Sequence, residues 1–131
     1  FQILINLKNK RFKLSLPTIK KNNNMDFYLW SFNDPLRVNQ MGIPEPYKKI
    51  KVYPDVLIVP LVAFDKNKFR LGYGGGYYDR YIKKISKLKN IFKVGFAFSF
   101  QEILKLPIGR YDQRLDVILT DKNIITWIYY F

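Results

Sequence analysis

The chain has 131 residues, 48% of them hydrophobic, and a formal net charge of +13. This length and composition fit one globular domain, residues 1–131, with a sizeable core, and they exclude an intrinsically disordered chain. Cysteine and histidine are absent, which excludes disulfides, Cys/His zinc sites, thiol nucleophiles and catalytic triads with an imidazole base. Chemistry must therefore use carboxylates, Lys, Arg, Tyr, backbone N–H groups or an oxygen-bound metal ion.

The first half of the chain is predicted to contain two strands and a long loop. Residues 1–9 carry closely spaced apolar side chains and read as the end of a helix. Alternating apolar residues predict a strand over 11–17, and residues 25–32 predict a second strand after a turn at 20–24. Residues 33–54 contain several prolines and little periodicity, which indicates a long surface loop.

In the second half, predicted strands alternate with predicted helices. The apolar run 55–60 predicts a central strand buried on both faces, followed by a turn at 65–67. A helix is expected over 76–88, with an apolar face made by Tyr78, Tyr81, Ile82, Ile85 and Leu88. Residues 92–99 and 116–120 predict strands, and 100–107 a short helix ended by proline. This order indicates an α/β layered domain with a central mixed, mostly parallel sheet flanked by helices.

The positive charge attracts anions without identifying them. Basic residues extend from Lys8 to Lys122 and form no compact arm. The charge therefore reflects lysine-rich composition, or attraction of small anions such as nucleotides and polyglutamate tails; nucleic-acid binding is the least favoured interpretation. The apolar runs are too short to cross a bilayer and no signal-peptide pattern opens the chain, so we expect a cytoplasmic protein without membrane contact. Whether the aromatic residues 127–131 are exposed or belong to an interface stays open.

A glycine-rich loop holds four of the seven glycines, Gly72, Gly74, Gly75 and Gly76, directly before the predicted helix. Glycines let phosphate oxygens approach backbone N–H groups at the positive end of a helix dipole. Arg70 adds a positive charge beside them. The spacing matches neither a dinucleotide-binding fingerprint nor a P-loop. Taken alone, it favours a phosphate-binding loop and a flexible turn about equally.

Two acidic positions are candidate metal ligands. Asp79 falls in the first turn of the predicted helix, where it can complement the dipole, pair with Lys83 or bind Mg²⁺. Asp112 lies with Asp116 at the edge of the last strand, where turn formation or pairing with neighbouring arginines is the simpler interpretation.

The stretch 54–82, "PDVLIVPLVAFDKNKFRLGYGGGYYDRYI", resembles the signature of the 5-formyltetrahydrofolate cyclo-ligase family. Upstream "MDFYLW" and "GIPEP", and downstream "GFAFSFQ" and "YDQRLDVILTD", resemble further family segments in the right order. The resemblance covers roughly residues 10–122. It implies an α/β enzyme that uses ATP and Mg²⁺ to convert 5-formyltetrahydrofolate to 5,10-methenyltetrahydrofolate, with ADP and phosphate as products.

The resemblance also implies roles for individual residues. Arg70 would act on the phosphates as the catalytic residue. The ATP-binding residues would be Arg70, Leu71, Gly72, Tyr73, Gly74, Gly75, Gly76, Tyr77 and Tyr78. The folate would contact Met25 and Phe27 together with Tyr73, Gly74, Gly75, Gly76 and Tyr77. Asp79 and Asp112 would hold Mg²⁺, whereas Asp116 corresponds to a structural position at the start of a strand.

The family normally begins with a further N-terminal segment that carries a basic motif near the nucleotide and a Glu facing the folate. This chain shows neither, so we expect an N-terminally incomplete domain with an uncovered apolar sheet face. That face would favour self-association, or a second chain would supply the segment. The alternatives to an active cyclo-ligase are an inactive truncated relic or nucleotide- or folate-binding module, and a basic nucleic-acid-binding protein.

Overall fold

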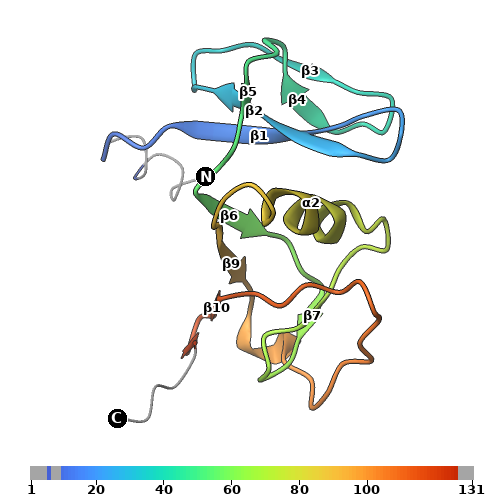
Figure 1. The fold of residues 1–131 in the computed structure, drawn as a ribbon. Coiled ribbons are helices and arrows are strands. Elements are labelled where there is room, and N and C mark those ends of the chain that lie inside the picture. The colour runs from blue at the N-terminus through green and yellow to red at the C-terminus, as the bar shows by residue number, and fades with distance from the viewer. Residues whose placement is uncertain (1–5, 7–9, 127–131) are drawn as a thin grey trace. The chain divides into compact units, whose positions relative to one another are not determined.

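The computed structural model of the chain describes residue 6 and residues 10–126 (Figure 1). The expectations for a helix end at 1–9, apart from the exposed helical Asn6, and for the aromatic residues 127–131 lie outside the described residues. The chain divides into two compact units, Phe1–Pro54 and Asp55–Phe131, which are described separately. The expectation of a single domain stays a prediction.

The first unit contains a three-stranded antiparallel sheet in the order β1-β2-β5. Strand β1 covers Leu14–Ile19, β2 covers Met25–Trp30 and β5 covers Lys51–Val52. The two strands predicted over 11–17 and 25–32 are confirmed as β1 and β2, which pair along their whole length. Their register is set by the hairpin turn between them, where Lys20 N–H donates to Asn24 O at 2.8 Å.

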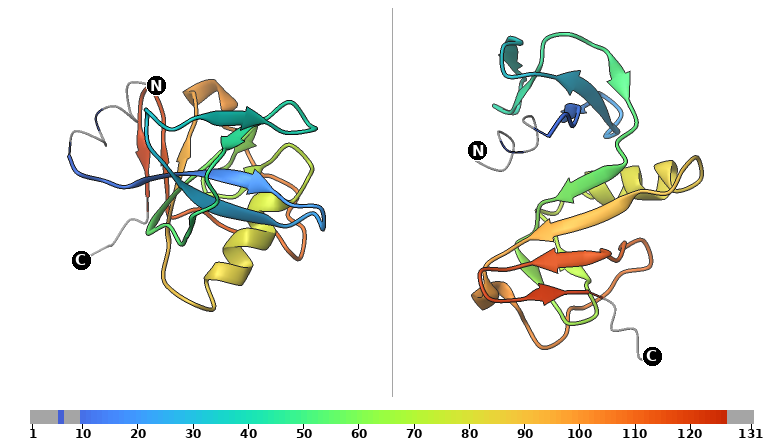
Figure 2. Two further views of the ribbon diagram at one scale, coloured as in Figure 1. Left: turned by 90° about the horizontal axis from the view of Figure 1, so that it is seen from above. Right: turned by 90° about the vertical axis from the view of Figure 1, so that its left-hand side faces the viewer.

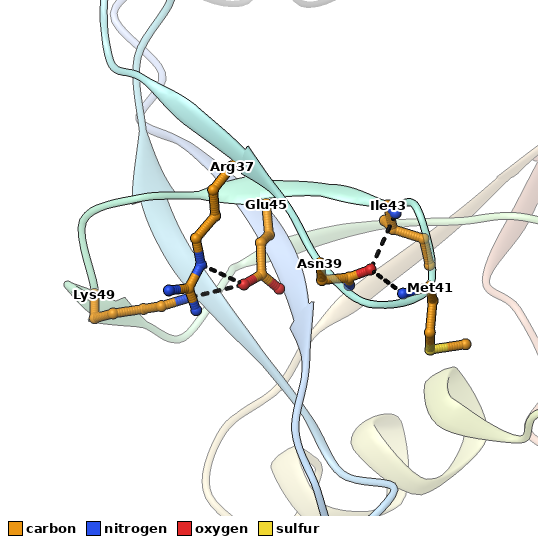
Figure 3. Close-up of polar contacts among 6 residues, drawn as sticks. All are labelled: Arg37, Asn39, Met41, Ile43, Glu45 and Lys49. Carbon is orange, nitrogen blue, oxygen red and sulfur yellow. Dashed lines mark hydrogen bonds and ion pairs between the residues drawn. The ribbon is translucent and has the colours of Figure 1, made fainter.

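Residues 33–54 are not the long loop that the sequence predicted. They form the hairpin of β3, Leu36–Val38, and β4, Pro44–Pro46, and then β5. Asn39 closes the hairpin turn, because its Oδ1 accepts the backbone N–H groups of Met41 at 2.9 Å and Ile43 at 3.0 Å (Figure 3). Prolines at both ends of β4 removed the alternation by which strands are recognised.

A buried carboxylate fixes the register of this hairpin. Glu45 is 3% exposed and lies opposite Arg37, whose Nε is 2.8 Å from Glu45 Oε1 (Figure 3). Lys49 Nζ lies 3.4 Å from the same oxygen. Burial pushes the pKa of Glu45 upward, but Arg37 and Lys49 outweigh burial and hold the pKa below its usual value.

The second unit is built on a mixed sheet in the order β11-β10-β9-β6. Strands β6 (Val56–Val59), β9 (Phe92–Phe96) and β10 (Val117–Leu119) are parallel, and β11 (Ile124–Ile125) pairs antiparallel to β10. The mixed sheet is as expected. A mostly parallel sheet flanked by helices is not confirmed, because the remaining sheets are antiparallel and residues 10–126 contain one α-helix.

Strand β6 lies at the edge of this sheet, so the prediction of a central strand buried on both faces is wrong. Its side chains alternate: Leu57 and Val59 are buried, whereas Val56 and Ile58 are exposed. The continuous apolar run therefore predicted correctly that a strand forms here, but it did not predict which faces of the strand are buried.

The helix α2 covers Tyr77–Ile85 and lies beside β6 and β9 (Figure 2). Its buried residues are Tyr81, Ile82 and Ile85, which confirms the centre of the predicted apolar face. The helix ends at Ile85 instead of Leu88, which is 66% exposed and contributes nothing to the core. No helix within the described residues has the length and apolar character needed to cross a membrane.

The predicted helix over 100–107 is wrong. Only the 3₁₀ turn η1, Ser99–Gln101, is helical there. After it, Glu102 pairs with Phe64, and the N–H of Ile103 donates to Phe64 O at 2.8 Å, so the chain runs extended beside β7 (Ala63–Phe64). Pairing with a strand distant in sequence outweighed a weak local helical preference.

Candidate functional site

The glycine-rich loop lies between a short hairpin and α2. The hairpin consists of β7 and β8, Arg70–Leu71, with Phe64 opposite Arg70 and the predicted turn between them. The loop Gly72–Gly76 follows β8 directly, and Gly76 is the N-cap of α2. The chain therefore arrives at a helix N-terminus through glycines, as the sequence predicted.

Arg70 is the charged side chain at the base of this loop. Its side chain is 5% exposed, Nη1 donates to Pro60 O at 3.2 Å, and Nη2 lies 3.2 Å from Asp79 Oδ1. Its Nε is buried without a hydrogen-bond partner among the described residues. The guanidinium also lies 5.8 Å from the ring centroid of Tyr78. Burial raises the pKa of Tyr78, and the charge of Arg70 opposes that rise only in part, so Tyr78 remains a neutral phenol.

Side chains from the loop's own ends occupy the space beside Gly72 and Gly76, whereas a Cβ on Gly74 would meet nothing within 4 Å. A Cβ on Gly72 would lie 2.5 Å from Arg70 Nη1, and a Cβ on Gly76 would lie 2.7 Å from Arg80 Nη1. Gly74 and Gly76 also have positive φ angles of 94° and 66°, which other residues adopt at a cost. Two guanidinium groups thus lie against the backbone where a phosphate would approach.

The start of α2 offers backbone donors. Gly76 is left-handed, no side chain caps the helix, and the first helical hydrogen bond runs from Arg80 N–H to Gly76 O at 3.1 Å. The N–H groups of a first helical turn point away from the helix and carry the positive end of its dipole. Together with Arg70, they make this terminus suited to an anion.

Asp79 lies between this terminus and the loop 109–115. Its Oδ1 accepts the N–H of Gln113 at 3.3 Å besides pairing with Arg70. Asp112, the neighbour of Gln113, is exposed and accepts the N–H of Gly109 at 2.7 Å through Oδ2. The structure therefore brings the segment of the second predicted metal ligand to the first, although they are far apart in sequence.

The two carboxylates do not form a complete cage for a metal ion. Within the described residues, no group of three or more His, Cys, Asp or Glu side chains could hold one. Two carboxylates fit Mg²⁺ only when the ion arrives with phosphate oxygens and water as further ligands. The donor set is hard and oxygen-based, so it fits that use, and the metal role of Asp79 and Asp112 stays a prediction.

Three further cations of the second unit each lie over an aromatic ring. Arg80 lies 5.0 Å from the Tyr77 ring centroid, and Arg114 lies 4.7 Å from that of Phe69. Lys83, which the sequence offered as a partner of Asp79, lies instead 5.1 Å from the ring of Tyr111. The contact of Arg80 holds positive charge beside Gly76 and reinforces the attraction of the loop for anions. The sequence analysis did not identify Arg80 as a residue of the loop. The available signal was its place one helical turn after Gly76, which puts the two residues on the same side of the helix.

The other predicted site residues have mixed surroundings. Tyr73 is 80% exposed and Leu71 is 48% exposed, so both are open to a ligand. Met25 and Phe27 are 4% and 5% exposed within β2 of the first unit, so their predicted folate contacts stay a prediction. Asp116 accepts Lys93 N–H at 2.7 Å, which fits its predicted structural role at the start of β10.

A cavity of about 440 Å³ lies at the opposite end of α2 from the glycine loop. Its charged residues neutralise one another, because Lys89 pairs with Asp55 and Lys93 pairs with Asp116. The cavity therefore lacks the net positive charge that distinguishes the loop.

Known proteins are similar to this chain in sequence and in fold. A 5-formyltetrahydrofolate cyclo-ligase from Haemophilus influenzae is 42% identical over 90 residues, which are 65% of this chain and 48% of that protein. One from Escherichia coli K12 is 37% identical over 109 residues, 79% of this chain and 59% of that protein. The chain thus spans about half to three-fifths of these relatives.

The structure of Aquifex aeolicus 5,10-methenyltetrahydrofolate synthetase superposes with a TM-score of 0.77 at 37% identity, over 95% of this chain and 63% of that one. A synthetase of the same name from Mycoplasma pneumoniae gives 0.62 at 27% identity, over 89% of this chain and 61% of that one. The family profile described as "5-formyltetrahydrofolate cyclo-ligase family" matches residues 2–121. The chain therefore belongs to the 5-formyltetrahydrofolate cyclo-ligase family.

Proposed function

We propose that this protein catalyses the ATP- and Mg²⁺-dependent cyclisation of 5-formyltetrahydrofolate to 5,10-methenyltetrahydrofolate. The observation that carries the proposal is the buried guanidinium of Arg70, which lies beside Gly72 at the base of a glycine loop that opens α2. Family membership supplies the reaction, and this geometry supplies an anion site suited to ATP phosphates.

The reaction needs a better leaving group than a formamide oxygen. Transfer of the γ-phosphoryl of ATP to the formyl oxygen releases ADP and leaves an iminium-like phosphate ester. The N10 amine then attacks the formyl carbon, and the five-membered ring closes as the C–O bond breaks. Phosphate departs with the oxygen and takes up the proton that N10 loses. Such a phosphoryl transfer depends on positioning and charge stabilisation more than on an acid–base residue. A chain without histidine and cysteine can therefore perform it.

Each proposed role fits the contacts of the residue concerned. Arg70 would stabilise the charge of the transferring phosphoryl group, and the N–H groups of Gly72–Gly76 would bind the remaining phosphate oxygens. Asp79 and Asp112 would hold Mg²⁺, which neutralises the phosphates when bound. The exposed Tyr73, with Tyr77, would face the folate.

The test is formation of methenyl product by the purified chain. Mg-ATP and 5-formyltetrahydrofolate are supplied, and methenyltetrahydrofolate absorbance, ADP and phosphate are measured together. The proposal expects the three products in equal amounts, and a loss of at least about 100-fold in rate for Arg70→Ala, since the arginine stabilises the transition-state charge. Arg11→Ala, which removes an exposed arginine from the first unit, is the matched control and should retain the rate.

A second candidate is a nucleotide-binding module without the chemistry. The observation that favours it is that the described residues hold an uncapped helix terminus suited to an anion, but no group of three or more His, Cys, Asp or Glu side chains that could hold a metal ion. Calorimetric titration with Mg-ATP separates the two candidates: binding without methenyl formation supports the module and refutes the enzyme. Failure to bind either ligand refutes both.

A further inference from the structure

Asp65 is a buried carboxylate that the proposed reaction does not use. It is 1% exposed, although an isolated charge is costly to bury. Its oxygens accept three backbone N–H groups: Oδ1 from Asn67 at 2.9 Å and Phe69 at 3.2 Å, and Oδ2 from Leu106 at 3.2 Å. A carboxylate satisfied entirely by backbone donors fixes those donors in space.

The first two bonds shape the turn between β7 and β8. Lys68 within this turn has a φ of 64°, which is unfavourable for a residue with a side chain. Backbone bonds close the same turn, from Lys68 N–H to Asp65 O at 3.0 Å and from Asp65 N–H to Phe69 O at 3.1 Å. Asp65 therefore stabilises a strained turn immediately before Arg70.

The turn holds both segments of the proposed site. On one side, β8 delivers Arg70 to its contacts with Pro60 O and Asp79. On the other side, Lys68 O accepts the N–H of buried Leu115 at 2.9 Å, which anchors the end of the loop that carries Asp112. A shift of this turn would move the proposed phosphate ligand and the second proposed metal ligand together.

The third bond fixes the turn to the body of the unit. Leu106 is 4% exposed and lies far along the chain, beyond η1. Because Oδ2 holds Leu106 N–H, the hairpin cannot slide relative to the segment that pairs with β7. Asp65 thus connects the hairpin, the loop 109–115 and the segment after η1.

We propose that Asp65 is a positioning residue that holds Arg70 and the Asp112 loop in register for nucleotide binding. This inference rests on the proposed function as far as the nucleotide is concerned. The ordering of the loop by Asp65 is independent of any ligand.

Asp65→Asn is the informative variant. Its Oδ1 can still accept from Asn67 and Phe69, but its NH₂ group meets the N–H of Leu106, so only the long-range bond is lost. Asp121→Asn is the matched control, since Asp121 also accepts a backbone N–H, from Ser99 at 2.6 Å, but has no bond to the hairpin. We expect Asp65→Asn to weaken Mg-ATP binding about tenfold, the loss of one charged hydrogen bond, while Asp121→Asn binds like wild type.

Two measurements separate positioning from simple destabilisation. Calorimetry is performed at a temperature where circular dichroism shows each variant folded, and is repeated in an Arg70→Ala background. If Asp65 acts through Arg70, Asp65→Asn weakens binding much less in that background, whereas its loss of stability persists. An equal weakening in both backgrounds would show that Asp65 does not act through Arg70 and would overturn its proposed positioning of that residue.

Hydrogen exchange of the amides from Arg70 to Gly76, measured without nucleotide, gives an answer that needs no binding. Faster exchange in Asp65→Asn but not in Asp121→Asn supports the proposal, and unchanged exchange overturns it. If wild type fails to bind Mg-ATP, the proposed function fails, and the exchange result alone decides whether Asp65 orders the loop.

Discussion

Nη2 of Arg70 lies 3.2 Å from Oδ1 of Asp79, so an ion pair joins the strand that enters the glycine loop to the helix that leaves it. The side chain of Arg70 is 5% exposed and that of Asp79 is 20% exposed, so water screens this pair less than a surface pair. The proposed reaction would require each partner to change its contact: Arg70 to phosphate and Asp79 to Mg²⁺.

Asp79→Asn tests this exchange of partners. Removing the carboxylate frees Arg70 and removes a negative charge near the phosphates, so metal-free ATP should bind about tenfold more tightly. The same change should abolish most of the gain in affinity that Mg²⁺ gives. Calorimetry with ATP in the presence of Mg²⁺ or of EDTA measures both effects. Asp55→Asn, an exposed aspartate of the same unit, is the control, and an Asp79→Asn variant with wild-type Mg²⁺ dependence would exclude the metal role.

Gly76→Ala separates backbone strain from ligand approach. Gly76 and Gly42 have similar positive φ angles, 66° and 76°, so alanine at either should cost roughly 1–2 kcal/mol of unfolding free energy. Only at Gly76 does the new Cβ meet a guanidinium, that of Arg80, whereas nothing lies within 4 Å at Gly42. We expect both variants to lose stability in denaturant titrations and Gly76→Ala alone to weaken Mg-ATP binding. Equal nucleotide affinity in the two variants would contradict the loop assignment.

Ile82→Ala tests the packing of α2. Ile82 is 1% exposed and lies on the buried face of the helix, so truncation should cost about 2–5 kcal/mol of unfolding free energy. Leu88→Ala removes a 66% exposed side chain beyond the helix end and should change stability by no more than about 0.5 kcal/mol. Urea titrations followed by circular dichroism compare them, and similar losses would mean that α2 does not bury this face in solution.

The acid stability of the first unit should depend on Asp26. Burial raises the pKa of this carboxyl, but ion pairs with Lys20 and Lys51 more than offset burial and lower the pKa below its usual value. A lowered folded-state pKa stabilises the fold above the unfolded pKa of about 3.9, and this stability is lost as pH falls through the folded pKa. Stability should therefore fall below about pH 4, and Asp26→Asn should flatten that fall.

Fluorescence of Trp30, which is 8% exposed in the same unit, can follow urea unfolding from pH 2 to pH 7 in a Trp127→Phe background. Asp55→Asn, a change in the other unit, should leave the profile of Trp30 unchanged. A profile of Asp26→Asn that parallels wild type would show that other groups control acid unfolding.

Short-range patterns predicted the elements whose structure depends mainly on their own residues. The helical spacing of Tyr81, Ile82 and Ile85 predicted α2, and alternating apolar residues predicted β1, because side-chain periodicity follows directly from backbone geometry. The glycines marked the loop, and the ordered motifs indicated the family that the comparisons confirm. The place of Asp79 in the first helical turn identified it as a candidate metal ligand, but its ion pair with Arg70 was not predicted.

Tertiary structure decided what depends on residues far apart in the chain. The prolines of β4 interrupt the alternating pattern by which a strand is predicted from sequence. The position of β4 is set instead by pairing with β3 and by the contact of Arg37 with buried Glu45. A distant partner also determines the segment after η1, which pairs with Phe64 instead of forming the predicted helix. The position of β6 at a sheet edge depends on which strands pair with one another. An apolar run in the sequence does not identify those pairings.

At the site, the sequence by itself determined which groups are available: Arg70, the glycines and two aspartates. Only the folded chain brought Gln113 within hydrogen-bonding distance of Asp79 and placed three backbone donors around Asp65. The physical reason is that these bonds form when the loss of chain entropy on closing long loops is offset by burial of the surrounding core. Local propensity carries no information about that balance.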